Sequence, residues 1–255
     1  MNFPGLAMPD SNTAFSYRGY RIVTAQDDQA ARSLVDRVLS NQIEILEVYR
    51  DNRNSFTAKC IFGSREAVIK VPRGKNRKRI ARFFTLFRSS EPVRRYNDMT
   101  ALRRLGINGP MPVLAAEKRS SGMVVDSFLM YLYIQGRVPE SGDESAVLKE
   151  VRRLHRMGYT RKDSKPENFL VNGSNVYLID FKLKRPVLFK KTRINMELAW
   201  LVRRMPGALD HIGEEERGSF LFRFGSMLDK VFLFTRTWRK KARRALFGPS
   251  ANTVK

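Results

Sequence analysis

The first half of the chain alternates short apolar runs with polar turns, a pattern that is typical of β-strands. We expect a short strand over 17–23, and apolar residues at helical spacing predict an amphipathic helix over 27–39. Three strand-like runs follow closely, over 43–49, 55–62 and 67–71. The turns between them are short and polar, so these runs are predicted to form an antiparallel meander.

The second half is richer in helices. The further predicted elements are a helix over 92–105, strands over 113–118 and 124–134, a helix over 143–157, strands over 169–171 and 176–179, and helices from about residue 192. The change of pattern near 135–142 predicts an α+β fold of two lobes with a cleft between them. We divide the chain into an N-terminal extension over 1–40, a first lobe over 41–134 and a second lobe over 135–255.

Composition constrains the partner and the compartment. There are 48 Lys and Arg against 25 Asp and Glu, a net charge of +23, which requires an anionic partner such as nucleic acid, an acidic membrane or a phosphorylated substrate. The 42% of hydrophobic residues can form a core, and the single Cys excludes an intramolecular disulfide and argues against a structural zinc site. Without a long apolar run or a secretory signal, we expect a cytoplasmic chain.

One segment holds the residue types that phosphoryl transfer requires. It contains Asp163, Lys165 and Asn168, and Asp180 follows twelve residues later. The reaction needs a carboxylate at the attacking hydroxyl, oxygen ligands for Mg²⁺ and a cation near the phosphates, which Lys165 could supply. A turn at 172–173 would return Asp180 to Asn168. The simpler alternatives are an ordinary loop with turn hydrogen bonds and a solvated Lys165.

A second lysine, Lys70, lies in an otherwise apolar strand. Its ammonium is costly there unless it reaches an anion or an open cleft, although it could also extend to solvent from an edge strand. Asp98 on the following helix is the first choice for its acidic partner, and Glu91 is the second. Asp98 could instead pair with Arg94 or Arg95 on its own helix.

As a set, these motifs resemble those of the protein-kinase-like fold. They are Asp-Ser-Lys-Pro-Glu-Asn from 163 to 168, Asp-Phe-Lys at 180–182 and Val-Ile-Lys ending at residue 70. The size of the chain, the basic Phe-rich segment 77–88 and the run Leu-Gly-Ile-Asn-Gly-Pro-Met-Pro resemble most closely the lipopolysaccharide core heptose kinases of Gram-negative bacteria. The resemblance implies a sheet-containing first lobe, a mostly helical second lobe, and ATP and Mg²⁺ as cofactors.

The resemblance also implies a role for each matching residue. It makes Asp163 the catalytic base, Asn168 and Asp180 the Mg²⁺ ligands, Lys70 the lysine on the α- and β-phosphates with Asp98 as its orienting acid, and Leu132 and Tyr133 the hinge residues nearest adenine. The histidines, His155 and His211, are assigned no role.

The sequence departs from the kinase pattern in four places. A polar run at 50–55 replaces the Gly-rich loop, so phosphate cover needs another backbone conformation or Arg side chains. Lys182 replaces the glycine of Asp-Phe-Gly, so no flexible switch is expected there. Arg161 replaces the usual His or Tyr, and Asp98 is one methylene shorter than the usual Glu. None of these changes removes the base or a metal ligand, which favours an active enzyme over a pseudokinase.

Two basic runs could be solvated faces or membrane contacts. The run 73–82 leads into Phe83, Phe84 and Phe87, whose spacing fits either lipid contact or packing on the first lobe. The run 235–247 alternates Arg and Lys with apolar residues, as interfacial helices do.

The favoured function is ATP-dependent phosphorylation of a heptose hydroxyl in the lipopolysaccharide inner core. The partner would be an anionic, lipid-anchored core intermediate, and the enzyme would be peripheral on the cytoplasmic face of the inner membrane. The alternatives are a protein Ser/Thr kinase, a small-molecule kinase or a basic nucleic-acid-binding protein. No nucleic-acid-binding motif is present, so a nucleic-acid partner is not expected.

Overall fold

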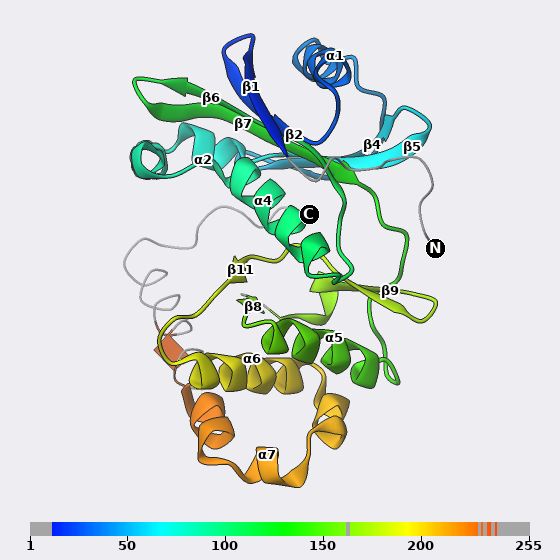
Figure 1. Ribbon diagram of the computed structural model, residues 1–255, viewed down its shortest axis with the longest axis vertical. Helices are drawn as coiled ribbons and strands as arrows, with labels where there is room; N and C mark the ends of the chain where they lie inside the picture. The colour runs from blue at the N-terminus through cyan, green and yellow to red at the C-terminus, as the bar shows by residue number, and fades with distance from the viewer. Residues whose placement is uncertain (1–11, 162–163, 229–230, 232–233, 236–237, 239–255) are drawn as a thin grey trace. The chain divides into compact units, whose positions relative to one another are not determined.

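The computed structural model describes residues 12–161, 164–228, 231, 234–235 and 238 (Figure 1). Asp163 and most of the interfacial helix expected over 235–247 lie outside the described residues. The chain divides into two compact units, residues 1–135 and 136–255.

The first unit contains a seven-stranded sheet whose paired neighbours are all antiparallel, in the order β1-β2-β6-β7-β5-β4-β3. Its strands are β1 (Thr13–Tyr17), β2 (Tyr20–Thr24), β3 (Ile45–Asp51), β4 (Phe56–Phe62), β5 (Arg65–Val71), β6 (Pro112–Ser120) and β7 (Met123–Leu132). Its helices are α1 (Asp28–Leu39), α2 (Arg73–Arg77), α3 (Arg79–Phe83), the 3₁₀ helix η1 (Phe84–Phe87) and α4 (Glu91–Arg104). The meander of β3, β4 and β5 and the helices α1 and α4 confirm the predictions for these segments.

The single strand expected over 17–23 is wrong, because the structure forms a hairpin there. Arg18 and Gly19 both have positive φ, 48° and 76°, and Tyr17 pairs with Tyr20 across them. Such a two-residue turn matches the twist of the flanking strands. Since β2 pairs with β6, this hairpin is part of the sheet of the first unit.

The sheet carries helices α1 and α4 on opposite faces (Figure 1). On the α1 face, a buried cluster joins Leu34 of α1 to Ile22, Ile69 and Met130 of three strands. Successive side chains of a strand point to opposite faces, so Lys70, which follows Ile69, lies on the α4 face. Cys60 is a fully buried member of the α1-face cluster, as expected for a small apolar residue.

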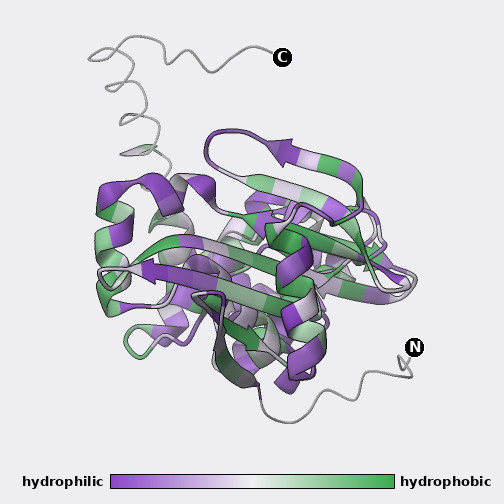
Figure 2. Cartoon of the chain, turned by 90° about the horizontal axis from the view of Figure 1, so that it is seen from above, coloured by the Kyte–Doolittle hydropathy of each residue, from purple (hydrophilic) through white to green (hydrophobic). Residues whose placement is uncertain are grey.

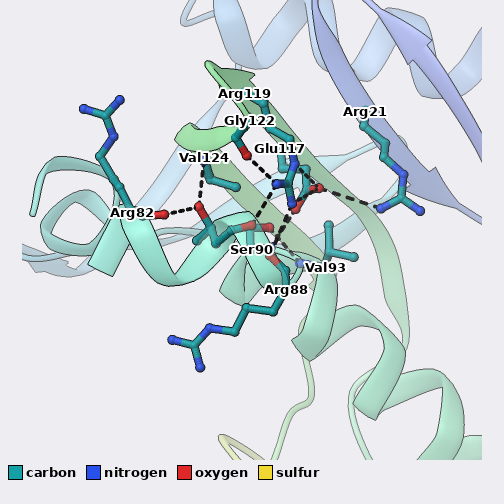
Figure 3. Close-up of polar contacts among 10 residues, drawn as sticks. Arg21, Arg82, Arg88, Ser90, Val93, Glu117, Arg119, Gly122 and Val124 are labelled. Atoms are coloured by element: carbon teal, nitrogen blue, oxygen red, sulfur yellow. Dashed lines mark hydrogen bonds and ion pairs between the residues drawn. The ribbon is translucent and has the colours of Figure 1, made fainter. Parts of the chain in front are cut away.

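The β6–β7 hairpin is fastened to the segment that precedes α4 by a buried carboxylate (Figure 3). Along β6 the residues change from hydrophobic to hydrophilic (Figure 2), yet Glu117 in the hydrophilic part is only 1% exposed. The backbone N–H of Ser90 donates to Glu117 Oε2 over 2.6 Å, and Arg119 Nη2 lies 3.0 Å from Oε1. Burial acts to raise the pKa of Glu117, but these donors outweigh it and hold the pKa below its ordinary value.

The second unit is mostly helical, with two small antiparallel sheets. Its helices are α5 (Glu144–Arg156), α6 (Lys190–Arg204), α7 (Glu214–Gly218) and the 3₁₀ helices η2 (Pro166–Asn168) and η3 (Pro206–His211), and its strands are β8 (Thr160–Arg161), β9 (Phe169–Asn172), β10 (Asn175–Leu178) and β11 (Leu183–Lys184). The helix α5 and the β9–β10 hairpin confirm the predictions, whereas the β8–β11 pair was not predicted. Within the described part of the chain, no helix has the length and apolar character that crossing a bilayer requires.

We predict that Glu117→Ala lowers the free energy of unfolding by about 3 kcal/mol, because it leaves buried donors without an acceptor. Urea unfolding at pH 7 measures this, with the exposed Glu47→Ala of β3 as the control. The folded-state pKa of Glu117 is depressed, so its contribution is present above the ordinary value of 4.5 and is lost as the pH falls through the lower folded value. The difference in the free energy of unfolding between wild type and Glu117→Ala should therefore shrink in acid. A difference that does not change with pH would contradict a stabilising role for the ionised carboxylate.

Candidate active site

The β9–β10 hairpin brings the two residues expected to bind the metal to neighbouring positions. The backbone N–H of Ile179 donates to Asn168 O over 2.9 Å. Asp180, the next residue after Ile179, is therefore close to Asn168 along the backbone. Asn168 is buried and its own N–H closes a turn onto Lys165 O at 3.0 Å. Asp180 is exposed and adopts a left-handed backbone with φ of 44°. The return predicted from the Asn172-Gly173 turn is therefore observed.

A second pairing holds the other ends of the same two segments. In the β8–β11 pair, Arg161 lies opposite Leu183 and Thr160 lies opposite Lys184. Two backbone contacts, which we call tethers, thus join the segments of Asp163 and Asp180. The β8–β11 tether lies before Asp163 and after Asp180 in the chain, and the Asn168–Ile179 tether lies after Asp163 and before Asp180. The described residues around Asp163 and Asp180 are held on two sides by backbone hydrogen bonds, which restricts how far these segments can separate.

Glu197 of α6 binds the chain on both sides of Asp163. Its carboxylate is 5% exposed and accepts a hydrogen bond from the backbone N–H of Arg161 at 3.0 Å and from the hydroxyl of Ser164 at 2.7 Å. His155 Nε2 lies 3.0 Å from the same carboxylate. Three separate groups therefore satisfy one buried charge, which is the condition under which such burial is tolerated.

Two residues that the sequence left without a role take part in this network. Arg161, which replaces the usual His or Tyr, is 4% exposed, and its guanidinium carbon lies 4.0 Å from the centroid of the Phe169 ring. His155 of α5 connects a second helix to Glu197. Sequence reasoning missed this set because Glu197 lies 33 to 42 residues from Ser164 and His155, and no spacing motif spans such separations.

The replacement of glycine by Lys182 has a local explanation. Among the described residues, the non-glycine positions with positive φ include Asp180 but not Lys182. Glycine is favoured where φ is positive, and because φ is not positive at position 182, lysine is accommodated there without strain. The buried Phe181 separates the two positions.

In the first unit, Lys70 lies on the α4 face of the sheet and is partly buried. Glu91, the second choice for its partner, forms ion pairs with Lys75 and with Arg95. Burial lowers the pKa of Arg94, and the carboxylates of Glu91 and Asp98 oppose this shift, so Asp98 also lies near Arg94. The Lys70–Asp98 pairing stays a prediction, and Glu91 has other cationic neighbours.

The polar turn that replaces the Gly-rich loop uses its own backbone groups internally. Asn52 Oδ1 accepts hydrogen bonds from the N–H groups of Asn54 at 2.9 Å and of Ser55 at 3.0 Å. Gly74 N–H donates to Asn54 O over 2.7 Å. A Cβ on Gly74 would lie 2.8 Å from Asn54 Oδ1 and 3.1 Å from Asn54 Cα, so a larger residue at position 74 would require Asn54 to shift. These engaged N–H groups are not open for phosphate binding in this conformation.

The predicted hinge also has its N–H groups engaged. The N–H of Leu132 donates to Met111 O at 2.8 Å and that of Tyr133 donates to Glu66 O at 2.9 Å. The Tyr133 ring lies against the ammonium of Lys59, 4.4 Å from its centroid. An adenine at these two residues would therefore have to be recognised through carbonyl oxygens or side chains.

A cavity of about 570 Å³ lies within the second unit, beside the tethered segments. Arg161 and Glu197 take part in its wall, and Met196, Trp200 and Phe224 make much of the lining apolar. This cavity could not be predicted from the sequence, because its lining comes from β8, β11, α6 and the helical residues 220–228, which are far apart along the chain.

Comparison with protein families gives a match over residues 12–205 to the family described as "Lipopolysaccharide core biosynthesis protein (WaaY)". This span is about three quarters of the sequence. The chain belongs to this family. The search of the curated proteins found no match.

Comparison with solved structures gives similar chains, among them these three. The putative fructosamine-3-kinase from Haemophilus somnus 129PT is 10% identical, with a TM-score of 0.51 over 82% of this chain and 91% of that one. WaaP in complex with acyl carrier protein is 16% identical, with a TM-score of 0.48 over 82% and 92%. Spectinomycin phosphotransferase APH(9)-Ia, in complex with ADP and spectinomycin, is 12% identical, with a TM-score of 0.49 over 87% and 90%.

These findings confirm the predicted α+β, protein-kinase-like fold and the predicted family. The chain is a protein of lipopolysaccharide core biosynthesis with a protein-kinase-like fold.

We predict that Glu197→Gln lowers kcat roughly 100-fold with little change in the KM for ATP, since one donor loses its acceptor and the segment around Asp163 is displaced. Steady-state phosphoryl transfer measures both constants. The exposed Glu214→Gln of α7 is the control and should behave as wild type. A Glu197→Gln enzyme with wild-type kcat would show that this network does not position the site.

Proposed function

We propose that this protein is a kinase, which transfers the γ-phosphoryl group of ATP to a heptose hydroxyl of the lipopolysaccharide inner core. The observation that carries the proposal is the pair of backbone tethers that hold the segments of Asn168 and Asp180 together, in a chain of the WaaY family. The acceptor would be an anionic, lipid-anchored core intermediate, and its phosphates suit the charge of +23.

In this proposal, Asp163 accepts the proton of the attacking hydroxyl and orients its oxygen toward the γ-phosphorus. Lys70 neutralises charge on the α- and β-phosphates, and Lys165 neutralises the transferred group. Asn168 and Asp180 fit a magnesium ion, because amide and carboxylate oxygens are its usual protein ligands. Bound there with the nucleotide, magnesium would offset the negative charge of the phosphates.

Leu132 and Tyr133 are proposed to contact adenine through their carbonyl oxygens or side chains, because their N–H groups are engaged. Phosphate cover is proposed to come from Arg50 and Arg53 rather than from the backbone of the polar turn, whose N–H groups bond to Asn52 Oδ1. Guanidinium groups bind phosphate oxygens in pairs and do not need a glycine-rich backbone.

We further propose that the enzyme works at the cytoplasmic face of the inner membrane of a Gram-negative bacterium, where a lipid-anchored acceptor is accessible to ATP. Its association would be peripheral, through basic and aromatic surface residues.

We predict that Asp163→Asn and Asp180→Asn each lower turnover by roughly 1,000-fold or more without unfolding the protein. The assay is phosphate transfer from ATP to core oligosaccharide, together with phosphate analysis of the core from cells that carry each variant. Glu167→Gln, an exposed carboxylate in the same loop, is the matched control. If either aspartate variant works within about tenfold of wild type, its proposed role is wrong.

A separate prediction concerns the partner of Lys70. Asp98→Asn should raise the KM for ATP roughly tenfold, because Lys70 would lose the carboxylate that orients it, whereas Glu91→Gln should have a smaller effect on this constant. Each variant removes one negative charge from helix α4, so each serves as the charge-matched control for the other. The reverse order of effects would assign the role to Glu91.

A further inference from the structure

Five apolar side chains of α3 and η1 form an exposed surface on the first unit, which we call the α3–η1 surface. They are Ile80, Phe83, Phe84, Leu86 and Phe87, with exposed fractions of 76%, 53%, 51%, 41% and 81%. Packing on the first lobe, the alternative that the sequence left open, covers Phe83 and Phe84 only by about half and leaves Phe87 largely exposed. Exposed apolar residues gathered in this way mark an interaction site.

The aromatic side chains contact one another. The ring of Phe83 lies edge-on to that of Phe84, with 6.2 Å between centroids, and to that of Phe87, with 6.0 Å. The guanidinium carbon of Arg88 lies 5.5 Å from the centroid of Phe84. The three rings and their cation thus form one continuous apolar patch with a charged margin.

The backbone beneath this surface is held firmly (Figure 3). Arg119 Nη1 donates to Thr85 O at 2.8 Å, and the backbone N–H of Val124 donates to Thr85 Oγ1 at 2.8 Å. The β6–β7 turn also packs closely here, since a Cβ on Gly122 would meet Leu86 Cδ2 at 3.0 Å. The phenylalanines are therefore presented to solvent by an anchored segment and do not result from a frayed end.

The surroundings of the surface are strongly basic. Residues 67–90 contain eight Lys and Arg and no Asp or Glu. Two of these cations are neutralised nearby, Arg73 by Asp51 and Lys75 by Glu91. Figure 3 shows the guanidinium groups of Arg82 and Arg88 pointing away from the contact network. The occupant of this surface must accept apolar side chains and several positive charges together.

We propose that the α3–η1 surface docks the enzyme on an anionic lipid bilayer. Phenylalanine and isoleucine enter the boundary between headgroups and acyl chains, while neighbouring Lys and Arg bind lipid phosphates. A second copy of the chain is disfavoured because both surfaces would carry the same positive charge. Single-stranded nucleic acid stacks its bases on aromatic faces. It is disfavoured because the surface also exposes the aliphatic side chains of Ile80 and Leu86, which offer no such face.

The proposal rests on the proposed function in one respect, since a lipid-anchored acceptor explains why a kinase would dock on a bilayer. Binding to vesicles and activity are nevertheless measured separately. A kinase that is inactive on core oligosaccharide but binds vesicles would contradict the proposed function and leave this inference in place.

The test uses the full chain and vesicles of phosphatidylcholine with about a quarter phosphatidylglycerol. The triple variant Phe83→Ser, Phe84→Ser, Phe87→Ser should lower the vesicle partition coefficient by roughly 100-fold. Lys78→Gln with Arg79→Gln should lower it roughly tenfold and reduce its salt dependence. Activity on delipidated core oligosaccharide should stay at the wild-type level in both, which also shows that they fold.

The matched control replaces three exposed apolar residues of the second unit, Val187→Ser, Leu188→Ser and Phe220→Ser, which are 91%, 72% and 76% exposed. It should bind vesicles as wild type does. A second measurement uses Phe87→Trp, which keeps an apolar ring at this position. On binding to vesicles, its tryptophan fluorescence should shift to shorter wavelength, and brominated lipid should quench it more strongly than it quenches the fluorescence of wild type.

Equal vesicle binding by wild type and the triple Phe→Ser variant would overturn the proposal, as would an unquenched Phe87→Trp emission. Vesicle binding that nuclease treatment abolishes would assign the surface to nucleic acid. Self-association of wild type that the triple variant loses, with vesicle binding unchanged, would assign it to a second copy of the chain.

Discussion

A buried carboxylate in the second unit, that of Glu197, constrains the segments on which the proposed chemistry depends. A charge in the interior is tolerated only when donors surround it, and Glu197 receives a backbone N–H, a hydroxyl and an imidazole from three different places in the chain. Moving α6 away from the loop would leave all of these groups unpaired at once. The helix, the loop and α5 therefore hold their positions together, and the residues that flank Asp163 gain order from packing far from them in sequence.

The first unit uses the same physical device with Glu117. This carboxylate accepts the N–H of Ser90, the N-cap of α4, so it fixes the start of the helix that carries Asp98. Arg119, which contacts Glu117, also binds the backbone of the segment that presents the exposed phenylalanines. One buried charge thus orders both the helix that is proposed to orient Lys70 and the surface that is proposed to meet lipid.

Which features the sequence could predict depends on how far apart the interacting residues lie along the chain. The periodic elements were predictable because burial of one face leaves a repeating pattern, as in α5, and the β9–β10 return was predictable from its Asn-Gly turn. The β1–β2 hairpin was missed because Arg18 and Gly19 interrupt only briefly a run that otherwise looks like one strand. The β8–β11 pair has two residues on each side, too few for a pattern, and Glu197 acts across more than thirty residues. The kinase-like motif could be seen in the sequence because its residues lie close together there, and their catalytic roles stay predictions. The residues that hold this segment, such as Glu197, lie far from it in sequence.

The departures from the kinase pattern have a common physical character. Where the kinase pattern has glycine in the loop over the phosphates, this chain has a turn closed by the side chain of Asn52. Where the pattern has glycine after Asp-Phe, this chain has Lys182, which is not among the residues with positive φ. Both changes remove backbone freedom, and the tethers at Asn168 and Arg161 restrict the neighbouring segments further. A site with few internal movements depends on the acceptor arriving in a suitable orientation. The proposed acceptor, anchored in a bilayer on which the enzyme is also proposed to dock, would lose much of its rotational freedom before binding. The proposed site and the proposed membrane-docking surface are therefore consistent parts of one mechanism.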